Sequence, residues 1–262
     1  MISRDSAKVL VCAVLFISGP AGGAPTVEVK GECATVFKGQ VCTWARTQGN
    51  RLVEVGASVP MASIEGAPAE AEMAWPPVAE AKLRLPASSN AKSGLIQLTV
   101  FWEAMGHPPV QFMTPHFDFH FYVVPAGEEM TYSCKDRTKP AALPAAYTLP
   151  DQAMPPDMAK MIGTDTLFGI CVPNMGMHSL PTSEMQRTTT FRGDMVIGYY
   201  AGKPIFIEPM LTKAMLMEKK SFDLTIPMIP GLTGSYPHKF HAAYDAKEQS
   251  YRFRFSEFAP GT

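Results

Sequence analysis

The chain has 262 residues, of which 46% are hydrophobic and 18% are charged, and its formal net charge is −1. This composition supports a buried core, and the absence of a basic cluster argues against a protein that binds nucleic acid. The 24 prolines and 20 glycines interrupt the chain too often for long helices and favour short strands joined by turns. We therefore expect an all-β fold, with residues 25–262 forming a single sandwich- or barrel-like domain that has long Pro-rich loops and little helix.

Residues 1–24 are typical of a secretory signal peptide. Arg4 and Lys8 supply its positive charge, and the apolar run at 9–17 is too short to cross a membrane comfortably. Small residues follow, so we expect cleavage between Ala21 and Ala24; an uncleaved anchor is the alternative. The sequence thus predicts export to the periplasm or the extracellular space, with no stable membrane span after processing.

Ten strands are expected along the rest of the chain, from their β-branched and aromatic content and from the turn residues between them. They cover residues 27–30, 40–46, 52–55, 95–102, 116–124, 195–200, 203–208, 221–226, 240–244 and 251–258. A short helix is expected between Pro68 and Trp75, and one helical turn at 157–161. The Pro-rich stretch 125–156 is expected to be a long loop, either a lid over a site or a cover for the sheet.

Four cysteines remain once Cys12 is removed with the signal peptide, and in an exported chain they predict two disulfides. We favour Cys33–Cys42, which would close a hairpin, and Cys134–Cys171, which would tie the region after the 116–124 strand to the loop before His178. The alternative, a free or metal-binding pair, has no CxxC spacing to support it.

The most informative stretch is His116-Phe117-Asp118-Phe119-His120-Phe121. It alternates with period two, which indicates a strand with one polar and one apolar face. The three phenylalanines are expected in the core. The other face carries three groups that can ligate a metal ion or transfer a proton.

The spacing on this strand limits how its polar residues can act together. Residues two apart place their Cβ atoms roughly 6.6 Å apart on one face, so Asp118 and either neighbouring histidine could share one metal ion. His116 and His120 lie about 13 Å apart on a regular strand. Both can reach one ion only if the chain bends near Pro115; otherwise one of them acts elsewhere.

A metal site would need further ligands from distant segments. His178, expected in a loop of sequence MGMH, and Glu208, at the end of an apolar strand, are the candidates. Together with His116, Asp118 and His120 they form a nitrogen and oxygen donor set that suits a divalent transition metal such as Zn, Mn, Fe or Cu. Met175 and Met177 beside His178 could favour copper, although methionine is more often core filler.

Four motifs resemble those of an uncharacterised family of exported bacterial β-rich proteins, known only as a domain of unknown function: GHPP at 106–109, PHFDFHFY at 115–122, MGMH at 175–178 and FIEPM at 206–210. The resemblance covers roughly residues 30–226. It implies a β-rich fold in which these histidines belong together, and it brings no settled activity. At the position after Trp102, where the family pattern has Asn, this chain has Glu103. His107 of GHPP is expected to bond the turn backbone rather than a metal.

The sequence therefore predicts an exported protein with a His/Asp/Glu site for a metal ion or a small molecule. The alternative is a non-enzymatic envelope or stress-associated protein in which the His-Asp-His row is a structural polar network. Metal-free acid–base catalysis is a third possibility, and whether the protein is an enzyme stays open. No GxSxG or phosphate-binding glycine motif is present. A small-molecule ligand and a homo-oligomer are both compatible with the sequence.

Overall fold

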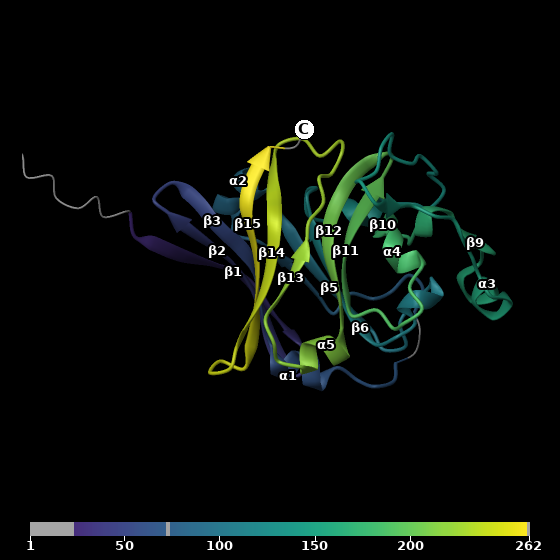
Figure 1. The fold of residues 1–262 in the computed structure, drawn as a ribbon, viewed down its shortest axis with the longest axis horizontal. Helices are drawn as coiled ribbons and strands as arrows, with labels where there is room; N and C mark the ends of the chain where they lie inside the picture. The colour runs from purple at the N-terminus through teal and green to yellow at the C-terminus, as the bar shows by residue number, and fades with distance from the viewer. Residues whose placement is uncertain (1–23, 72–73, 261–262) are drawn as a thin grey trace, which may run out of the picture.

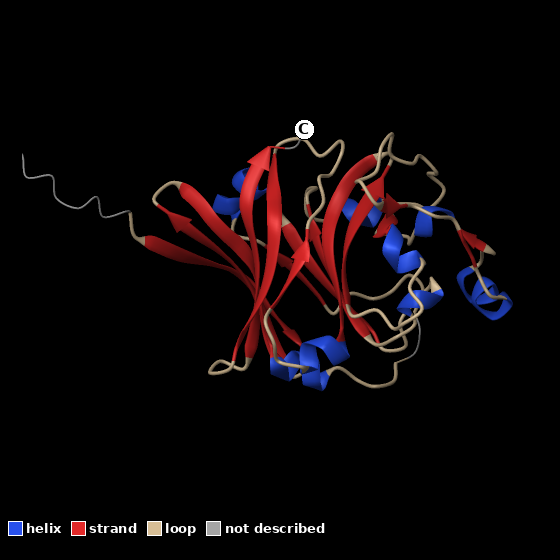
Figure 2. Ribbon diagram, in the orientation of Figure 1, coloured by secondary structure: helices blue, strands red, loops and turns tan. Residues whose placement is uncertain are grey.

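A computed structural model describes residues 24–71 and 74–260. In these ranges the chain forms two large antiparallel sheets that pack as a sandwich, together with a two-stranded ribbon (Figures 1 and 2). The all-β prediction is confirmed. The two large sheets stay open within the described residues, so the architecture is a sandwich and not a barrel. The predicted signal peptide, apart from Ala24, lies outside the described residues.

The six-stranded sheet contains both ends of the described chain. Its strands follow the order β1-β2-β3-β15-β14-β13. Their bounds are β1 Thr26–Val36, β2 Gly39–Gln48, β3 Arg51–Pro60, β13 Phe222–Thr225, β14 Ser235–Asp245 and β15 Ser250–Pro260.

The seven-stranded sheet contains the histidine-rich strand near its centre. Its order is β4-β5-β6-β12-β11-β10-β7. The bounds are β4 Ala81–Arg84, β5 Gln97–Glu103, β6 His116–Tyr122, β7 Tyr147–Thr148, β10 Met177–Pro181, β11 Gly193–Tyr200 and β12 Lys203–Thr212; the separate ribbon pairs β8 Gln152–Ala153 with β9 Thr166–Leu167. The predicted β11–β12 hairpin forms, and its turn residues Ala201 and Gly202 both have positive φ, which a tight hairpin turn requires.

The hydrophobic core lies between the two sheets, and the phenylalanines of β6 face into it as predicted. The ring of Phe119 lies 4.9 Å from that of Phe253 on β15, and Phe121 lies 4.6 Å from Phe255. All four side chains are fully buried. Because side chains alternate along a strand, His116, Asp118 and His120 must lie on the outer face of the seven-stranded sheet.

Helices are short and peripheral. They are α1 Met61–Gly66, α2 Ala87–Ser93, α3 Pro156–Ile162, α4 Thr182–Met185 and α5 Lys213–Met217. The helical turn expected at 157–161 is α3. The prediction of a helix between Pro68 and Trp75 is wrong, since the described residues of that segment are not helical. The nearest helix lies earlier in the chain, at α1. Met61 and Ile64 anchor α1 in the core, whereas the Ala- and Glu-rich segment has little apolar surface to bury.

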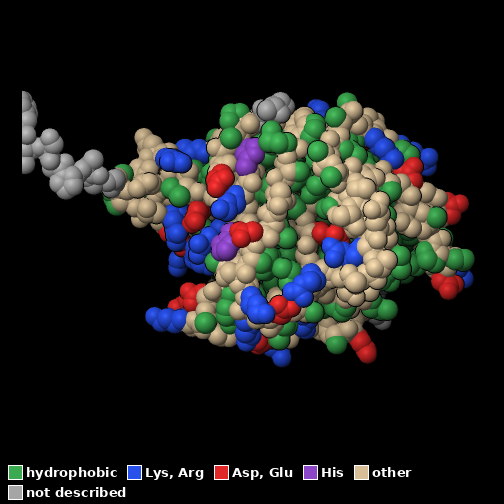
Figure 3. All heavy atoms as spheres, viewed as in Figure 1, with side chains coloured by type: hydrophobic (Ala, Val, Ile, Leu, Met, Phe, Trp, Pro, Cys, Tyr) green, Lys and Arg blue, Asp and Glu red, His purple; other side chains and the backbone are tan. Residues whose placement is uncertain are grey.

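Two disulfides join the pairs favoured from the sequence. Cys33–Cys42 bridges β1 and β2, and Cys134–Cys171 ties the loop after β6 to the segment just before β10. Within the described residues, no helix is both long enough and apolar enough to cross a membrane. On the side of the six-stranded sheet, basic and acidic side chains are interspersed (Figure 3). An example is Arg46, which pairs with Glu28 and Glu54.

Candidate metal centre

The outer face of β6 is buried beneath loops that cross the seven-stranded sheet. His116, Asp118 and His120 are 0%, 5% and 1% exposed. Pro77 and Pro108 belong to the segments that cover them. The polar side of this strand is therefore an enclosed site and not a solvent-facing surface.

Neighbouring strands bring the two distant candidates to the same place. β12 pairs with β6 so that Phe206 lies opposite Tyr122 and Met210 opposite Asp118. This register puts Glu208, between them on β12, level with His120 at the end of the histidine row. Glu208 is 1% exposed.

His178 reaches the site from β10, and not from the loop that the sequence suggested. Gly176, with φ +91°, ends the turn before it, and β10 then pairs with β11 so that His178 lies opposite Gly198. A Cβ atom at Gly198 would stand 2.2 Å from the ring of Phe206. The glycine thus makes room for Phe206, whose ring stacks on His120 at 4.3 Å.

The five predicted ligands do not converge on one point but divide into two groups. His120, His178 and Glu208 form the first group, and His116 and Asp118 form the second together with His107. Within each group, one donor atom from each residue lies within 4.8 Å of the others. The separation of His116 and His120 on a regular strand explains the division.

Distances within the groups match those between ligands of one ion. His120 Nε2 lies 3.4 Å from Glu208 Oε2, and in the second group His116 Nε2 and His107 Nε2 lie 3.3 and 3.4 Å from the two oxygens of Asp118. Two ligand atoms that are each about 2.1 Å from a tetrahedral ion lie roughly 3.4 Å apart. These three pairs therefore already have the spacing of neighbouring ligands of one ion, and the remaining donor atoms of each group lie within 4.8 Å.

The hydrogen-bond partners of the Nδ1 atoms determine which ring nitrogen of each histidine carries the proton. Nδ1 of His107, His116 and His178 contacts the backbone oxygens of Pro108, Thr114 and Ile170 at 2.8, 2.6 and 3.0 Å. A carbonyl oxygen only accepts, so Nδ1–H must donate in each case. In the neutral ring Nε2 then carries a lone pair, which in His107 and His116 faces a carboxylate oxygen. Metal-binding histidines are commonly held in this way.

Three of the facing donor atoms are left without a hydrogen-bond partner among the described groups. These buried atoms are His116 Nε2, Asp118 Oδ1 and Glu208 Oε2. Leaving a buried polar atom unsatisfied costs about 1–3 kcal/mol, and more for a charged one. A cation placed between the facing lone pairs would remove this cost in both groups.

Burial and neighbouring charges shift the titration of the first group. Burial lowers the pKa of His120 to about 4 and that of His178 to about 3, so both rings are neutral at pH 7. Burial, reinforced by Asp118, raises the pKa of Glu208 well above its usual value. Burial thus disfavours the ionised form of Glu208, and a bound cation would favour it.

In the second group, attraction between opposite charges outweighs burial in setting the pKa values. Burial raises the pKa of Asp118, but the facing His116 and His107 outweigh it and hold that pKa well below the ordinary value. Burial lowers the pKa of His107, but the contact with Asp118 outweighs it and raises the value to about 10. Without metal, His107 and Asp118 are therefore an ion pair.

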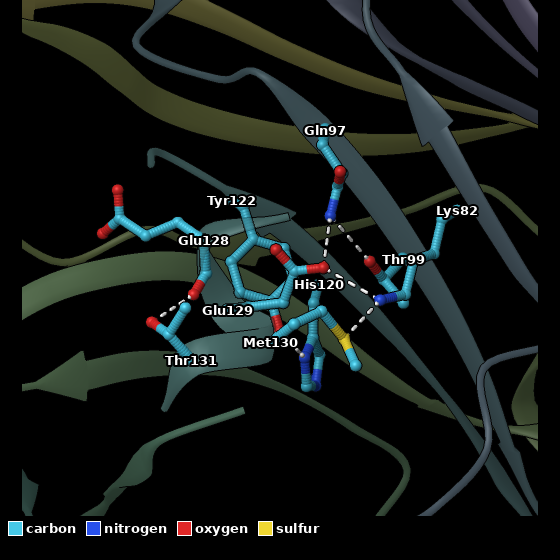
Figure 4. Close-up of polar contacts among 9 residues, drawn as sticks. All are labelled: Lys82, Gln97, Thr99, His120, Tyr122, Glu128, Glu129, Met130 and Thr131. Carbon is cyan, nitrogen blue, oxygen red and sulfur yellow. Dashed lines mark hydrogen bonds and ion pairs between the residues drawn. The ribbon is translucent and has the colours of Figure 1, made fainter. Parts of the chain in front are cut away.

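Two other buried carboxylates, Glu129 and Glu184, have basic partners of the usual kind. Glu129 accepts from Lys82 at 2.9 Å and from Gln97 at 3.1 Å (Figure 4), and Glu184 pairs with Arg187. In the described part of the chain, the ion-pair partners of Asp118 and Glu208 are all histidines. This difference sets the outer face of β6 apart from the ordinary buried ion pairs of the fold.

A small, largely apolar cavity adjoins both groups. Its lining includes His107, Asp118, His120, His178 and Glu208, together with Leu167, Ile170, Val172, Met175, Leu180 and Val196. It leaves about 40 Å³ for the centres of water-sized groups, which is room for an ion and a few small ligands. None of its lining residues is Lys or Arg.

Two residues of this site were missed or left in doubt by the sequence analysis. His107 does bond the turn backbone, as expected, but its other nitrogen faces Asp118; its place in the GHPP motif was the available signal. Glu103 ends β5 opposite His116 and lines the cavity. Burial raises the pKa of Glu103 to about 7, with His107 lowering it and the nearby carboxylates raising it.

Comparisons with protein-family models, with curated proteins and with solved structures gave no match for this chain. The resemblance of its motifs to an exported family stays a prediction.

Proposed function

We propose that this protein binds a divalent transition-metal ion through His120, His178 and Glu208. Two neutral imidazoles and one carboxylate from three strands of one sheet would hold the ion, and the cavity would leave room for water or a small ligand beside it. Zn, Mn, Fe and Cu all suit this donor set.

The observation that carries the proposal is the direction of the lone pairs. Nδ1–H of His178 donates a hydrogen bond to the carbonyl of Ile170, so the lone pair on Nε2 is free to bind a metal ion. His120 Nε2 lies 3.4 Å from an oxygen of Glu208 that has no hydrogen-bond partner among the described groups. A proton shared by one His–Glu pair would satisfy two of these three groups. A metal ion would satisfy all three.

The donor set also suggests chemistry. Two histidines and one carboxylate with open positions are used by catalytic zinc sites and by non-haem iron sites. In such a site the ion supplies a Lewis acid, and the protein residues orient it and limit access of water. Here, apolar residues of the cavity lining such as Leu167 and Val196 would limit the access of water.

Export fits this proposal. Two disulfides persist in oxidising compartments such as the periplasm or the extracellular space. We therefore propose an exported metal-binding protein, and we propose membership of the family that the four motifs resemble.

A structural polar network is the second candidate, and one observation favours it. Asp118 lies 3.4 Å from His107 Nε2, with which it forms an ion pair without metal, and 3.3 Å from His116 Nε2. In that case the row would hold the covering loops to the sheet, and no ion would be needed.

Elemental analysis distinguishes the two candidates. The full chain, purified from its exported form without chelator, is compared with His178→Ala and with His241→Ala. His241 is a matched control, because it pairs with Asp223 near the surface of the other sheet. The proposal expects near-stoichiometric metal in the parent and in His241→Ala, and loss of metal in a folded His178→Ala. Metal-free parent protein that is not stabilised by added Zn²⁺, Mn²⁺, Fe²⁺ or Cu²⁺ would favour the polar network.

A further inference from the structure

The second group of donors has the same features as the first, although the proposed function does not use it. His116 is fully buried, and its Nε2 has no hydrogen-bond partner among the described groups; the same is true of Asp118 Oδ1, which it faces at 3.3 Å. His107 Nε2 faces the other oxygen of Asp118 at 3.4 Å. Backbone carbonyls fix both imidazoles by accepting from their Nδ1 atoms.

The two groups are neighbours on one sheet face. Asp118 and His120 are two residues apart on β6, and Glu208 on β12 lies beside both. The Glu208 carboxyl is within 3.4 Å of His120 and within hydrogen-bonding reach of Asp118. A carboxylate in that position can contribute one oxygen to each group.

The carboxylates that line the cavity can balance most of the charge of two divalent cations. Glu103, Asp118 and Glu208 bring three carboxylates to a cavity that has no Lys or Arg in its lining. With these ionised and all four histidines neutral, two divalent ions give a net charge of +1. A charge of +1 is balanced by one small anion such as hydroxide, for which the 40 Å³ cavity has room.

We propose that the chain binds a second divalent transition-metal ion at His107, His116 and Asp118, so that the cavity holds a two-metal centre with Asp118 and Glu208 between the ions. This rests on the proposed function of the first group. A two-metal site can bind an oxygen ligand from both sides and lower the pKa of a shared water. The ligand class that fits is therefore hydroxide or another small oxygen anion.

The test is a Zn²⁺ titration of the full-length mature protein after removal of metal with chelator, followed by dialysis and elemental analysis. We expect two equivalents in the parent and in His241→Ala. We expect one in His178→Ala and one in His107→Ala. Among the three residues of the second group, substitution of His107 should disturb the fold least, because its side chain is 27% exposed. Circular dichroism checks folding, and His107→Gln replaces His107→Ala if that variant is not folded.

The outcomes separate the two proposals. One equivalent in the parent that His178→Ala removes and His107→Ala retains would overturn the second site and leave the first. No bound Zn²⁺ in any form would overturn both. Adjacency is tested with Cu²⁺, for which the proposal expects magnetic coupling in the electron paramagnetic resonance spectrum at two equivalents. Two bound ions with the spectrum of isolated Cu²⁺ would overturn the two-metal centre.

Discussion

The Tyr122 hydroxyl contacts Nδ1 of His120 at 3.3 Å (Figure 4). Backbone carbonyls hold the corresponding nitrogen of the other three site histidines. A substitution can remove the Tyr122 hydroxyl but not a backbone carbonyl, so the effect of ring orientation on metal binding can be tested at His120. The hydroxyl of Tyr122 fixes the ring so that Nε2 points toward Glu208.

Tyr122→Phe should weaken metal binding about 10- to 100-fold, which is the usual effect of losing the partner that orients a metal-binding histidine. The fold should survive, since the ring stays buried. Competition titration with a metal-sensitive dye measures the affinity. Tyr244→Phe on the other sheet is the control; its hydroxyl also lies buried, without a partner in the described chain. Equal affinity in Tyr122→Phe and the parent would contradict this role.

Alternate residues of β6 point to opposite faces of the sheet, so one set stabilises the core and the other set forms the candidate metal site. Phe119 is fully buried between the sheets, while Asp118 and His120 face the cavity. Phe119→Ala should lower the free energy of unfolding by about 3–5 kcal/mol because it leaves a void in the core. Urea denaturation measures this loss. Below the unfolding transition the metal content should be unchanged, and a folded variant that lacks metal would show that the two faces are coupled.

The Cys134–Cys171 disulfide connects the covering loops to the site. Cys171 follows Ile170, whose carbonyl accepts from His178. Cys134→Ala/Cys171→Ala should cost about 2–4 kcal/mol of stability and also weaken metal binding, because the carbonyl is less firmly held. Calorimetry gives both quantities. The Cys33→Ala/Cys42→Ala variant, remote from the cavity, should lose stability alone; equal effects of the two pairs on metal affinity would contradict this reasoning.

The elements show why part of the structure could be predicted from the sequence. The alternation in β6 fixes which side chains enter the core, and the flanking turns mark most strands. The helix expected at 68–75 failed because helix propensity alone does not supply a surface to bury. The resemblance of the four motifs implied that the histidines belong together, without saying how.

The site needed long-range pairing that no local pattern contains. His178 seemed to lie in a loop because Gly176 precedes it, yet it is the second residue of β10, whose pairing with β11 sets its position. His107 comes from a turn, and its contact with Asp118 depends on how that turn folds over β6. The division of the ligands into two groups follows from strand spacing, which the sequence did indicate for His116 and His120.

For the molecule as a whole, a buried acid away from the site predicts how stability depends on pH. Burial, reinforced by Glu184, raises the pKa of Asp194 to about 8. Between about pH 4 and pH 8 the folded chain therefore holds a proton that the unfolded chain has lost. The contribution of this group to stability is fully present below pH 4 and decreases as the pH rises to 8, with a slope of at most about 1.4 kcal/mol per pH unit.

Asp194→Asn should remove this dependence, because an amide does not titrate and can still donate to Glu184. Urea unfolding of metal-free protein at several values between pH 4.5 and 8.5 measures it. The difference in stability between variant and parent should grow in favour of the variant as the pH rises. A constant difference across this range would mean that Asp194 titrates normally.

Anomalous X-ray diffraction shows most directly whether His120, His178 and Glu208 share one metal ion. The data are recorded from a crystal of the metal-loaded protein at the absorption edge of that metal. Our account predicts a peak about 2.0–2.2 Å from Nε2 of both histidines and from a Glu208 oxygen. A metal-loaded crystal with no peak there, or with peaks only at surface residues such as His241, would contradict it.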